Sequence, residues 1–463
     1  MLPSFIQPTR IQNLNDRETA KGAYVLYWMQ QSQRAEYNHA LEYSLYTANR
    51  LKQPLIVLFC LTDNYPEANL RHYAFMVEGL LETRKKLEDR GIRMIARIGR
   101  PDRIVATAGR AASVIVCDRG YLKHQKKWRD QIADAVRCRV VRVESDTVIP
   151  VEVVSKKAEY AARTIRPRVH RHLPAYLTRF RHTRPAIPSL NLEIRGIPLD
   201  RTESVLGQLK IDRSVPPVPR FFKGGTTVAK YRFRQFVRNR LSRYDKNGNQ
   251  PQTDDISHMS PYLHFGQISP LYLALRIKAS GEHLKPAQDA LLEQLFIRRE
   301  LAINFVTYTP RYDTYDCAPG WAKQTLDTHR KDHRPYLYGP EELDRANTHD
   351  PYWNAAMQEM KFTGFMHNYM RMYWGKKILE WSKTPQTAYK TILALNNRYF
   401  LDGRDPNSYA GVAWTFGVHD RAWPERPIFG KIRYMAASGL ERKCAIGAYV
   451  EKVAHRVKKA NHI

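Results

Sequence analysis

Short apolar segments alternate with longer amphipathic segments in the first third of the chain. Five segments have the length and β-branched composition of buried strands: residues 23–29, 54–60, 92–98, 112–117 and 139–143. Between them, apolar residues recur with helical spacing near residues 36–50, 69–90 and 121–137. This alternation predicts a parallel, doubly wound sheet. No G-x-G-x-x-G follows the first segment, so other contacts must hold any ligand at the strand ends.

The pattern changes twice beyond residue 150. Prolines and arginines recur from 151 to 222, which predicts a long basic linker, partly helical and lying on the surface. From Thr226 onward the apolar spacing is helical almost everywhere. We therefore expect an N-terminal extension (1–21), an α/β domain (22–150), a linker (151–222) and an all-α domain (223–463).

Charge narrows the class of partner. The 463 residues carry a formal net charge of +30, and residues 156–243 hold 21 Lys and Arg against five Asp and Glu. A solvated basic surface is the simpler explanation. Because over half of the excess lies in a fifth of the chain, we favour a nucleic-acid partner bound through phosphate contacts.

Other features exclude some classes of protein. No apolar run reaches 18 residues, and the first 22 residues lack the apolar stretch of a signal peptide, so neither a membrane span nor secretion is expected. The five cysteines are far apart and form no CxxC pair. This argues against a metal cluster or a disulfide framework and favours a reducing cytoplasm.

Three of the eight tryptophans fall between residues 349 and 381. Trp374 and Trp381 are seven residues apart, so on a helix their rings share a face, roughly 10 Å apart along the axis. Trp353 lies in the preceding predicted helix. Such a set of indoles is most often core packing, but it can also carry an electron in short steps.

Four further segments contain polar residues suited to a site. Ser257 and Ser260 precede Pro261, with Tyr244 upstream, which fits a phosphate cradle or a simple helix cap. Residues 402–407 (DGRDPN) predict an ordered loop, too polar for the core, that forms either a corner or a pocket wall. Residues 291–305 place Gln294 and Arg298 on one helical face, although the RRE run could simply form an internal ion pair. GKIRYM (430–435) adds basic charge suited to phosphate contacts.

Taken together, these segments resemble the class II cyclobutane pyrimidine dimer DNA photolyases of the photolyase/cryptochrome superfamily. The matching segments are YWMQQSQRAEYNHAL (27–41), EYAARTIRPRV (159–169), SPYLHFGQIS (260–269), RREL (298–301), THDPYWNA (348–355), MRMYWGKKILEW (370–381), LDGRDPNSYAG (401–411), HDRAW (419–423) and GKIRYM (430–435). They run from near the N-terminus almost to the end of the chain.

The resemblance implies a Rossmann-like antenna domain, a linker and a C-terminal helical FAD domain. It implies FAD contacts from Tyr244, Ser257, His258, Met259, Ser260, Arg371, Asn396, Asp402 and Asp405, with Arg371 and Asp402 paired beside the flavin and Asn396 near its N5. Trp374, Trp353 and Trp381 would form a photoreduction chain. The substrate side would comprise Trp414, Met372, Gln294, Arg298, Asp420, Arg421, Lys431 and Arg433. No metal is expected.

The implied activity is light-driven splitting of cyclobutane pyrimidine dimers in double-stranded and single-stranded DNA, by a cytoplasmic monomer associated with the nucleoid, or with the nucleus in a eukaryote. An extruded dimer is poorly stacked and can lie on aromatic walls. Two departures concern the pocket: Gln294 stands where the family commonly has Glu, and the loop 414–420 is one residue shorter than usual. A Gln can donate a hydrogen bond but does not supply a proton.

Three alternatives rank lower. A cryptochrome photoreceptor would share FAD and the tryptophans but would not need the basic linker. A (6-4) photoproduct enzyme is expected to carry a His pair, whereas only His419 lies near this pocket in the sequence. A non-enzymatic nucleic-acid-binding protein would make the FAD segments coincidental. The antenna pigment stays open between a deazaflavin such as 8-hydroxy-deazaflavin, a folate, a flavin and none.

Overall fold

A six-stranded sheet forms the core of the N-terminal part of the protein. The computed structural model describes residues 2–461, and the sheet order is β1-β6-β5-β2-β3-β4. The strands are β1 (Ile11–Asn13), β2 (Tyr24–Met29), β3 (Leu55–Leu61), β4 (Arg93–Ile98), β5 (Ala112–Asp118) and β6 (Arg139–Val143). Every pairing is parallel except that of β1 with β6. The predicted doubly wound sheet is therefore confirmed.

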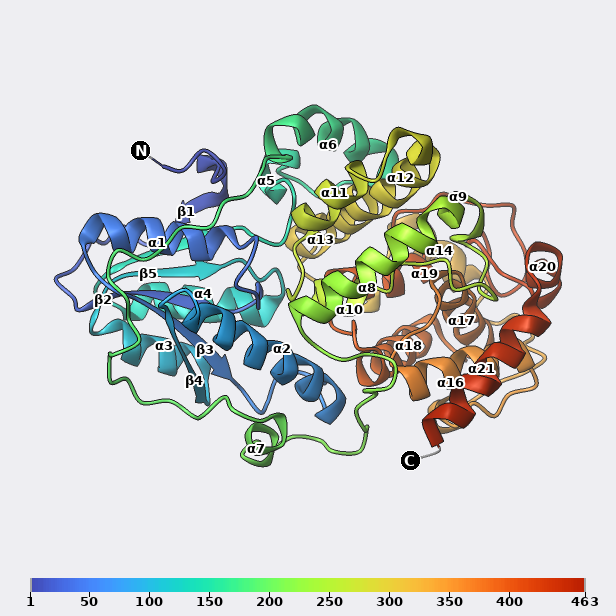
Figure 1. Ribbon diagram of the computed structural model, residues 1–463. Helices are drawn as coiled ribbons and strands as arrows, with labels where there is room; N and C mark the ends of the chain where they lie inside the picture. The colour runs from blue at the N-terminus through green and yellow to red at the C-terminus, as the bar shows by residue number, and fades with distance from the viewer. Residues whose placement is uncertain (1, 462–463) are drawn as a thin grey trace.

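Both faces of the sheet are covered by helices (Figure 1): α1 (His39–Leu51), α2 (Leu70–Glu88), α3 (Pro101–Gly109) and α4 (Lys123–Ala135). Because successive strand residues point to opposite faces, Tyr27 joins the core under α1 and α2, whereas Trp28 joins the core under α3 and α4. All residues of β2, β3 and β5 are buried. Burial on both faces explains the continuous apolar runs.

Two elements of this part were not predicted. β1 lies inside the expected N-terminal extension and adds an antiparallel edge strand through Ile11 and Val143. Helix α3 follows β4 and begins at Pro101, with proline in its first turn. A three-residue strand is stabilised by its partner rather than by its own composition, so its sequence shows no alternation.

The linker combines short helices with extended chain: α5 (Val151–Val154), α6 (Ala162–Tyr176) and α7 (Thr202–Gly207). Between α6 and α7 it runs along the α/β part (Figure 1), where Ser189 N–H donates to Gly91 O and Ile197 N–H donates to Ala96 O. It thus travels back over the α/β part before the helical part begins.

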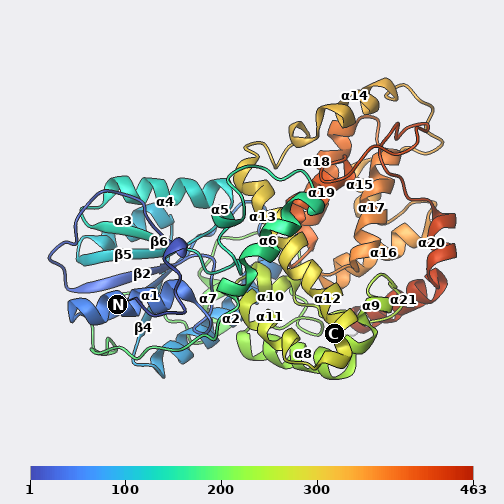
Figure 2. The ribbon, with the colours of Figure 1, turned by 90° about the horizontal axis from the view of Figure 1, so that it is seen from above.

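The remainder is helical, as the spacing predicted (Figure 2). Its helices are α8 (Thr226–Asn239), η2 (Leu241–Arg243), α9 (Tyr244–Asn247), α10 (Ser260–His264), α11 (Pro270–Lys278), η3 (Glu282–Leu284), α12 (Lys285–Leu292), η4 (Glu293–Arg298), α13 (Arg299–Tyr308), η5 (Tyr315–Cys317), α14 (Gly320–Thr328), α15 (Pro340–Asp344), α16 (Pro351–Thr363), α17 (Asn368–Trp381), α18 (Pro385–Tyr399), α19 (Pro406–Thr415), α20 (Ala437–Lys443) and α21 (Ile446–Asn461).

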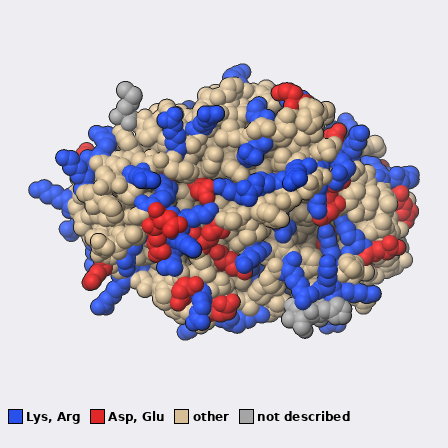
Figure 3. All heavy atoms as spheres, in the orientation of Figure 1, with Lys and Arg blue, Asp and Glu red and all other residues tan. Residues whose placement is uncertain are grey.

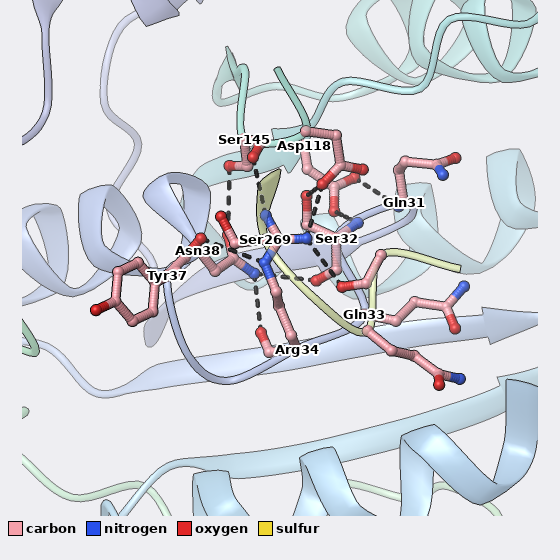
Figure 4. A network of polar contacts seen from close by, with 12 residues as sticks. Gln31, Ser32, Gln33, Arg34, Tyr37, Asn38, Asp118, Ser145 and Ser269 are labelled. Carbon is pink, nitrogen blue, oxygen red and sulfur yellow. Dashed lines mark hydrogen bonds and ion pairs between the residues drawn. The ribbon is translucent and has the colours of Figure 1, made fainter. Parts of the chain in front are cut away.

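A buried polar network ties the end of β2 to the helical part (Figure 4). The Asp118 carboxylate accepts from the backbone N–H groups of residues 30–32, and burial raises its pKa to about 6. Arg34 bonds Asp146 at 2.7 Å and the Gly266 carbonyl at 2.8 Å. Gln31 donates to the His264 carbonyl at 2.6 Å. The segment 27–41 therefore fixes the joint between the two parts.

Lys and Arg side chains are spread across the face seen in Figure 3, where Asp and Glu are fewer. None of the helices among residues 2–461 is long and apolar enough to cross a membrane. The five cysteines are unpaired.

Candidate functional site

Helix α17 brings three predicted site residues within one turn. Arg371 Nη2 lies 3.0 Å from both carboxylate oxygens of Asp402, and its guanidinium carbon lies 3.8 Å from the centroid of the Phe400 ring. Met372 follows, and Trp374 is almost fully buried. The predicted Arg371–Asp402 ion pair therefore exists in the folded chain, on the helix that also carries the first tryptophan.

The loop after α18 is buried, which corrects the expectation that residues 402–407 are too polar for the core. Asp402, Arg404 and Asp405 are each less than 9% exposed. Each has a partner: Asp402 pairs with Arg371, Asp405 lies 3.3 Å from His264 Nδ1, and Arg404 donates to the Asn397 carbonyl. Asp402 is therefore paired with a charge, whereas Arg404 is hydrogen-bonded to a carbonyl, and composition alone reveals neither partner.

Asn396 projects from the last turn of α18 beside this loop. Its Nδ2 donates to Asn397 Oδ1 at 2.9 Å, and its Oδ1 is 3.5 Å from the Ser408 hydroxyl. The Asn397 carboxamide in turn accepts from the Arg404 N–H at 2.9 Å. The Asn396 carboxamide is thus held by neighbours whose own positions are fixed.

The segment before α10 has free backbone donors. Among the residues described, no N–H group of residues 257–260 donates a hydrogen bond, and neither Ser257 nor Ser260 caps the helix. His258 has a φ of 54°, and its buried Nδ1 has no partner. A groove of about 480 Å³ adjoins Ser257 and His258 and is lined by four arginines: Arg220, Arg232, Arg240 and Arg456. Unsatisfied N–H groups beside positive charge suit a diphosphate.

Tyr244 begins α9 and packs edge-on against Phe236, a residue that lines the same groove. Burial raises the pKa of its phenol to about 12. Met259 is buried immediately before α10. These residues and the arginine-lined groove together fit the phosphate half of FAD.

The three tryptophans form a buried, connected set. Trp353 Nε1 donates to the Trp374 carbonyl at 3.0 Å, and the Trp353 and Trp381 rings are 5.6 Å apart between centroids. Trp381 is only 2% exposed, and its ring contacts Tyr338 and His349, each at 5.3 Å. Trp374 Nε1 is buried without a partner. The tryptophan set therefore reaches the surface through Tyr338 and His349. At its other end, the indole N–H of Trp374 has no hydrogen-bond acceptor among the residues described.

The predicted substrate residues come from separate elements. Gln294 and Arg298 are both exposed and lie on η4, a π-helical turn, rather than on a regular α-helix. Such turns occur frequently at functional sites. Arg298 Nε is 3.6 Å from Glu293, and Arg299 donates to the Asp146 carbonyl rather than to Glu300. Instead Glu300 accepts from the Val148 and Ile149 N–H groups, and burial raises its pKa to about 8.

A second group surrounds the partly exposed Trp414 at the end of α19. Arg433 lies 5.8 Å from the Trp414 ring and 4.8 Å from the Trp423 ring, which Arg421 also approaches at 5.4 Å. Lys431 is exposed beside them, and the Asp420 carbonyl accepts from the Tyr160 hydroxyl at 3.0 Å. These basic and aromatic residues form one surface around Trp414.

A cavity lies at the carboxyl ends of β2 and β3, where any ligand of the sheet was expected, but its lining residues were not predicted from the sequence. It measures about 80 Å³ and is lined by apolar and aromatic residues that include Trp28, Phe59, Tyr65 and Trp128. Arg404 also lines it, and Arg404 Nη2 is buried without a partner. Strand ends of a doubly wound sheet are a usual ligand site, which was the available signal. Arg404 lines this cavity because the helical part packs against the ends of these strands, and that packing could not be predicted from the sequence.

Comparison with solved structures defines the class of protein. A class III photolyase from Agrobacterium tumefaciens has a TM-score of 0.70 at 17% identity, covering 95% of this chain and 88% of that one. An archaeal photolyase from Sulfolobus tokodaii, solved with two FAD molecules, has a TM-score of 0.68 at 15% identity, covering 95% and 90%. The fold is that of the photolyases and cryptochromes.

Sequence relatives define the family. The DNA photolyase family model matches residues 25–189. The chain is 48% identical to the deoxyribodipyrimidine photo-lyase of Methanothermobacter thermautotrophicus, covering 97% of this chain and 99% of that protein. It is 38% identical to the photo-lyase of Potorous tridactylus, covering 93% and 81%. The chain belongs to the DNA photolyase family.

Proposed function

We propose that this protein repairs DNA in light by splitting cyclobutane pyrimidine dimers. The observation that supports this most directly is the single turn of α17 that carries Arg371, Met372 and Trp374. This turn brings together Arg371, which pairs with Asp402, Met372, which is expected in the dimer pocket, and Trp374, the first residue of the tryptophan set. The 48% identical relative is a deoxyribodipyrimidine photo-lyase.

FAD, when bound and reduced, supplies the electron that opens the dimer. The chain's residues would then act in the following ways. The N–H groups of residues 257–260 and Tyr244 hold the phosphates, and Arg371 and Asp402 flank the ring system with Asn396 beside N5. Asp405 fixes the loop behind them, since its carboxylate caps α19 and accepts from Asn407 N–H at 2.8 Å. Trp374, Trp353 and Trp381 pass an electron inward.

On the substrate side, Trp414 and Met372 would line the pocket for an extruded dimer, with Gln294 donating a hydrogen bond to it. Arg298, Arg421, Lys431 and Arg433 would contact DNA phosphates, and the Asp420 backbone would hold the loop. An asparagine beside N5 adds no charge, so it tolerates both neutral and anionic forms of the cofactor. We further propose that the enzyme is a class II, cytoplasmic monomer acting on double-stranded and single-stranded DNA.

The test is turnover of a dimer-containing duplex by the purified, reduced holoenzyme, with and without blue light. Light-dependent restoration of the pyrimidines is expected. Equal turnover in the dark would contradict the proposed chemistry, and no repair in light with intact flavin absorption would favour a photoreceptor. A (6-4) photoproduct duplex serves as the specificity control, on which no repair is expected.

We also propose that the cavity at the ends of β2 and β3 holds the antenna pigment, of the deazaflavin type. Its aromatic lining suits a planar ring, and the unpartnered Arg404 Nη2 suits an anionic group on that ring. An added near-ultraviolet or blue absorption band is expected after incubation with 8-hydroxy-deazaflavin. Loss of that band in Arg404→Met, with FAD absorption retained, would support this placement.

A further inference from the structure

Lys376 is a buried cation directly beneath the Trp414 indole. It lies on α17, is 0% exposed, and its Nζ is 4.5 Å from the centroid of the Trp414 ring. The Nζ group donates one hydrogen bond, 2.7 Å long, to the Thr415 carbonyl at the end of α19. Within the part of the chain that is described, no carboxylate oxygen lies within 4.0 Å of this ammonium group.

Such a residue needs an explanation, because lysine is almost never fully buried without a paired anion. The pKa of Lys376 is lowered to about 7, mainly by burial; Asp420 opposes this shift, and Arg433 adds a smaller lowering effect. One explanation is purely structural: the ammonium group caps the C-terminus of α19. A water molecule or a neutral donor would satisfy a single carbonyl equally well, however, and would not bring a charge under an aromatic ring.

We propose that Lys376 is a positioning residue for dimer repair, which fixes the Trp414 indole and places positive charge behind the wall on which the dimer lies. This inference rests on the proposed function, in which Trp414 lines the dimer pocket. Because Lys376 is shielded from water, its field acts at short range with little screening, whereas the more exposed Arg433 is screened.

The electron balance is simple. The dimer accepts one electron, the two carbon–carbon bonds of its cyclobutane ring break in turn, and the electron returns to the cofactor. Lys376 neither donates nor accepts an electron or a proton. Its positive charge stabilises the anionic form of the dimer. A larger fraction of the transferred electrons therefore leads to cleavage of both bonds before the electron returns to the cofactor.

The test compares repair per absorbed photon in the reduced holoenzyme and in Lys376→Met, which keeps the length of the side chain and removes the charge. We expect a several-fold loss of repair yield, with dark affinity for dimer DNA changed less than twofold. The Lys376→Arg variant should recover most of the yield. As a matched control, Lys361→Met removes another lysine that bonds a carbonyl and lies over an aromatic ring, that of Tyr399, and should leave the yield unchanged.

The pH profile separates charge from packing. In the wild type, the yield should fall as the pH rises from 6 to 9, because the amine becomes neutral; in Lys376→Met it should be flat at the low value. Equal yields in wild type and Lys376→Met across this range would overturn the inference, as would a loss explained wholly by weaker binding. If Lys376→Met does not fold, the same pH comparison between wild type and Lys376→Arg decides it, since the arginine variant should be flat at the high value. Absence of light-dependent repair in the wild type would instead reject the proposed function.

Discussion

The ion pair between Arg371 and Asp402 gives a prediction whose size follows from burial. The Asp402 side chain is 9% exposed and that of Arg371 is 22% exposed, and both carboxylate oxygens lie 3.0 Å from Nη2. Removing one partner of a fully buried pair costs about 3–5 kcal/mol, because the other charge is left uncompensated. Arg371 keeps its bond to the Met366 carbonyl and its contact with Phe400. We therefore expect about 2–3 kcal/mol for Asp402→Asn.

A double-mutant cycle in the apoprotein measures this interaction. The variants are Asp402→Asn, Arg371→Met and their combination, and the observable is the free energy of unfolding of the helical part in urea. The double variant should be less destabilised than the sum of the single variants, with a coupling free energy of about 2 kcal/mol. The exposed pair Arg84–Glu88, 3.1 Å apart with side chains 34% and 39% exposed, is the control and should couple by about 0.5 kcal/mol or less.

A coupling below about 0.5 kcal/mol for Arg371 and Asp402 would refute the reasoning, because the pair would then behave like one on the surface. The holoenzyme provides a second readout. Since FAD binds only the folded site, both single variants should retain less FAD after gel filtration than the wild type, whereas the Arg84 and Glu88 variants should retain as much.

Three further predictions concern the tryptophans, the pocket and the joint between the two parts. Trp374→Phe should abolish photoreduction of oxidised FAD, followed by absorbance under blue light, while chemically reduced enzyme still repairs; normal photoreduction would remove Trp374 from the chain. Gln294→Glu should raise the repair yield if a carboxyl group is needed at the dimer, and an unchanged or lower yield would show that the amide suffices. Burial raises the pKa of Glu300 from 4.5 to about 8, so the folded state binds its proton more tightly than the unfolded state, and stability is lost as the pH rises between these values. Glu300→Gln should remove up to about 5 kcal/mol of this pH-dependent loss, measured as unfolding free energy at pH 5 and pH 9; an unchanged slope would show that Glu300 is already ionised in the fold.

Periodicity predicted five strands of the sheet and the helical nature of everything after Thr226, because the spacing of apolar residues is a local property. It missed β1 and α3, whose formation depends on β6 and on a short connection after β4. The segments around Ser257, Asp402 and Trp374 were found in the sequence, because their residue types or the family resemblance set them apart. The spacing of these segments along the chain did not show how they lie relative to one another in the fold.

The sequence by itself determined the two kinds of architecture, the basic character and the list of candidate residues. Only the tertiary structure decided that the DGRDPN loop is buried, that Trp381 ends against Tyr338 and His349 rather than at the surface, and that Lys376 lies beneath Trp414. Each of these depends on residues distant in sequence that meet only in the folded chain. Whether a charge can be buried is set by the partner that meets it there, and composition does not encode that partner.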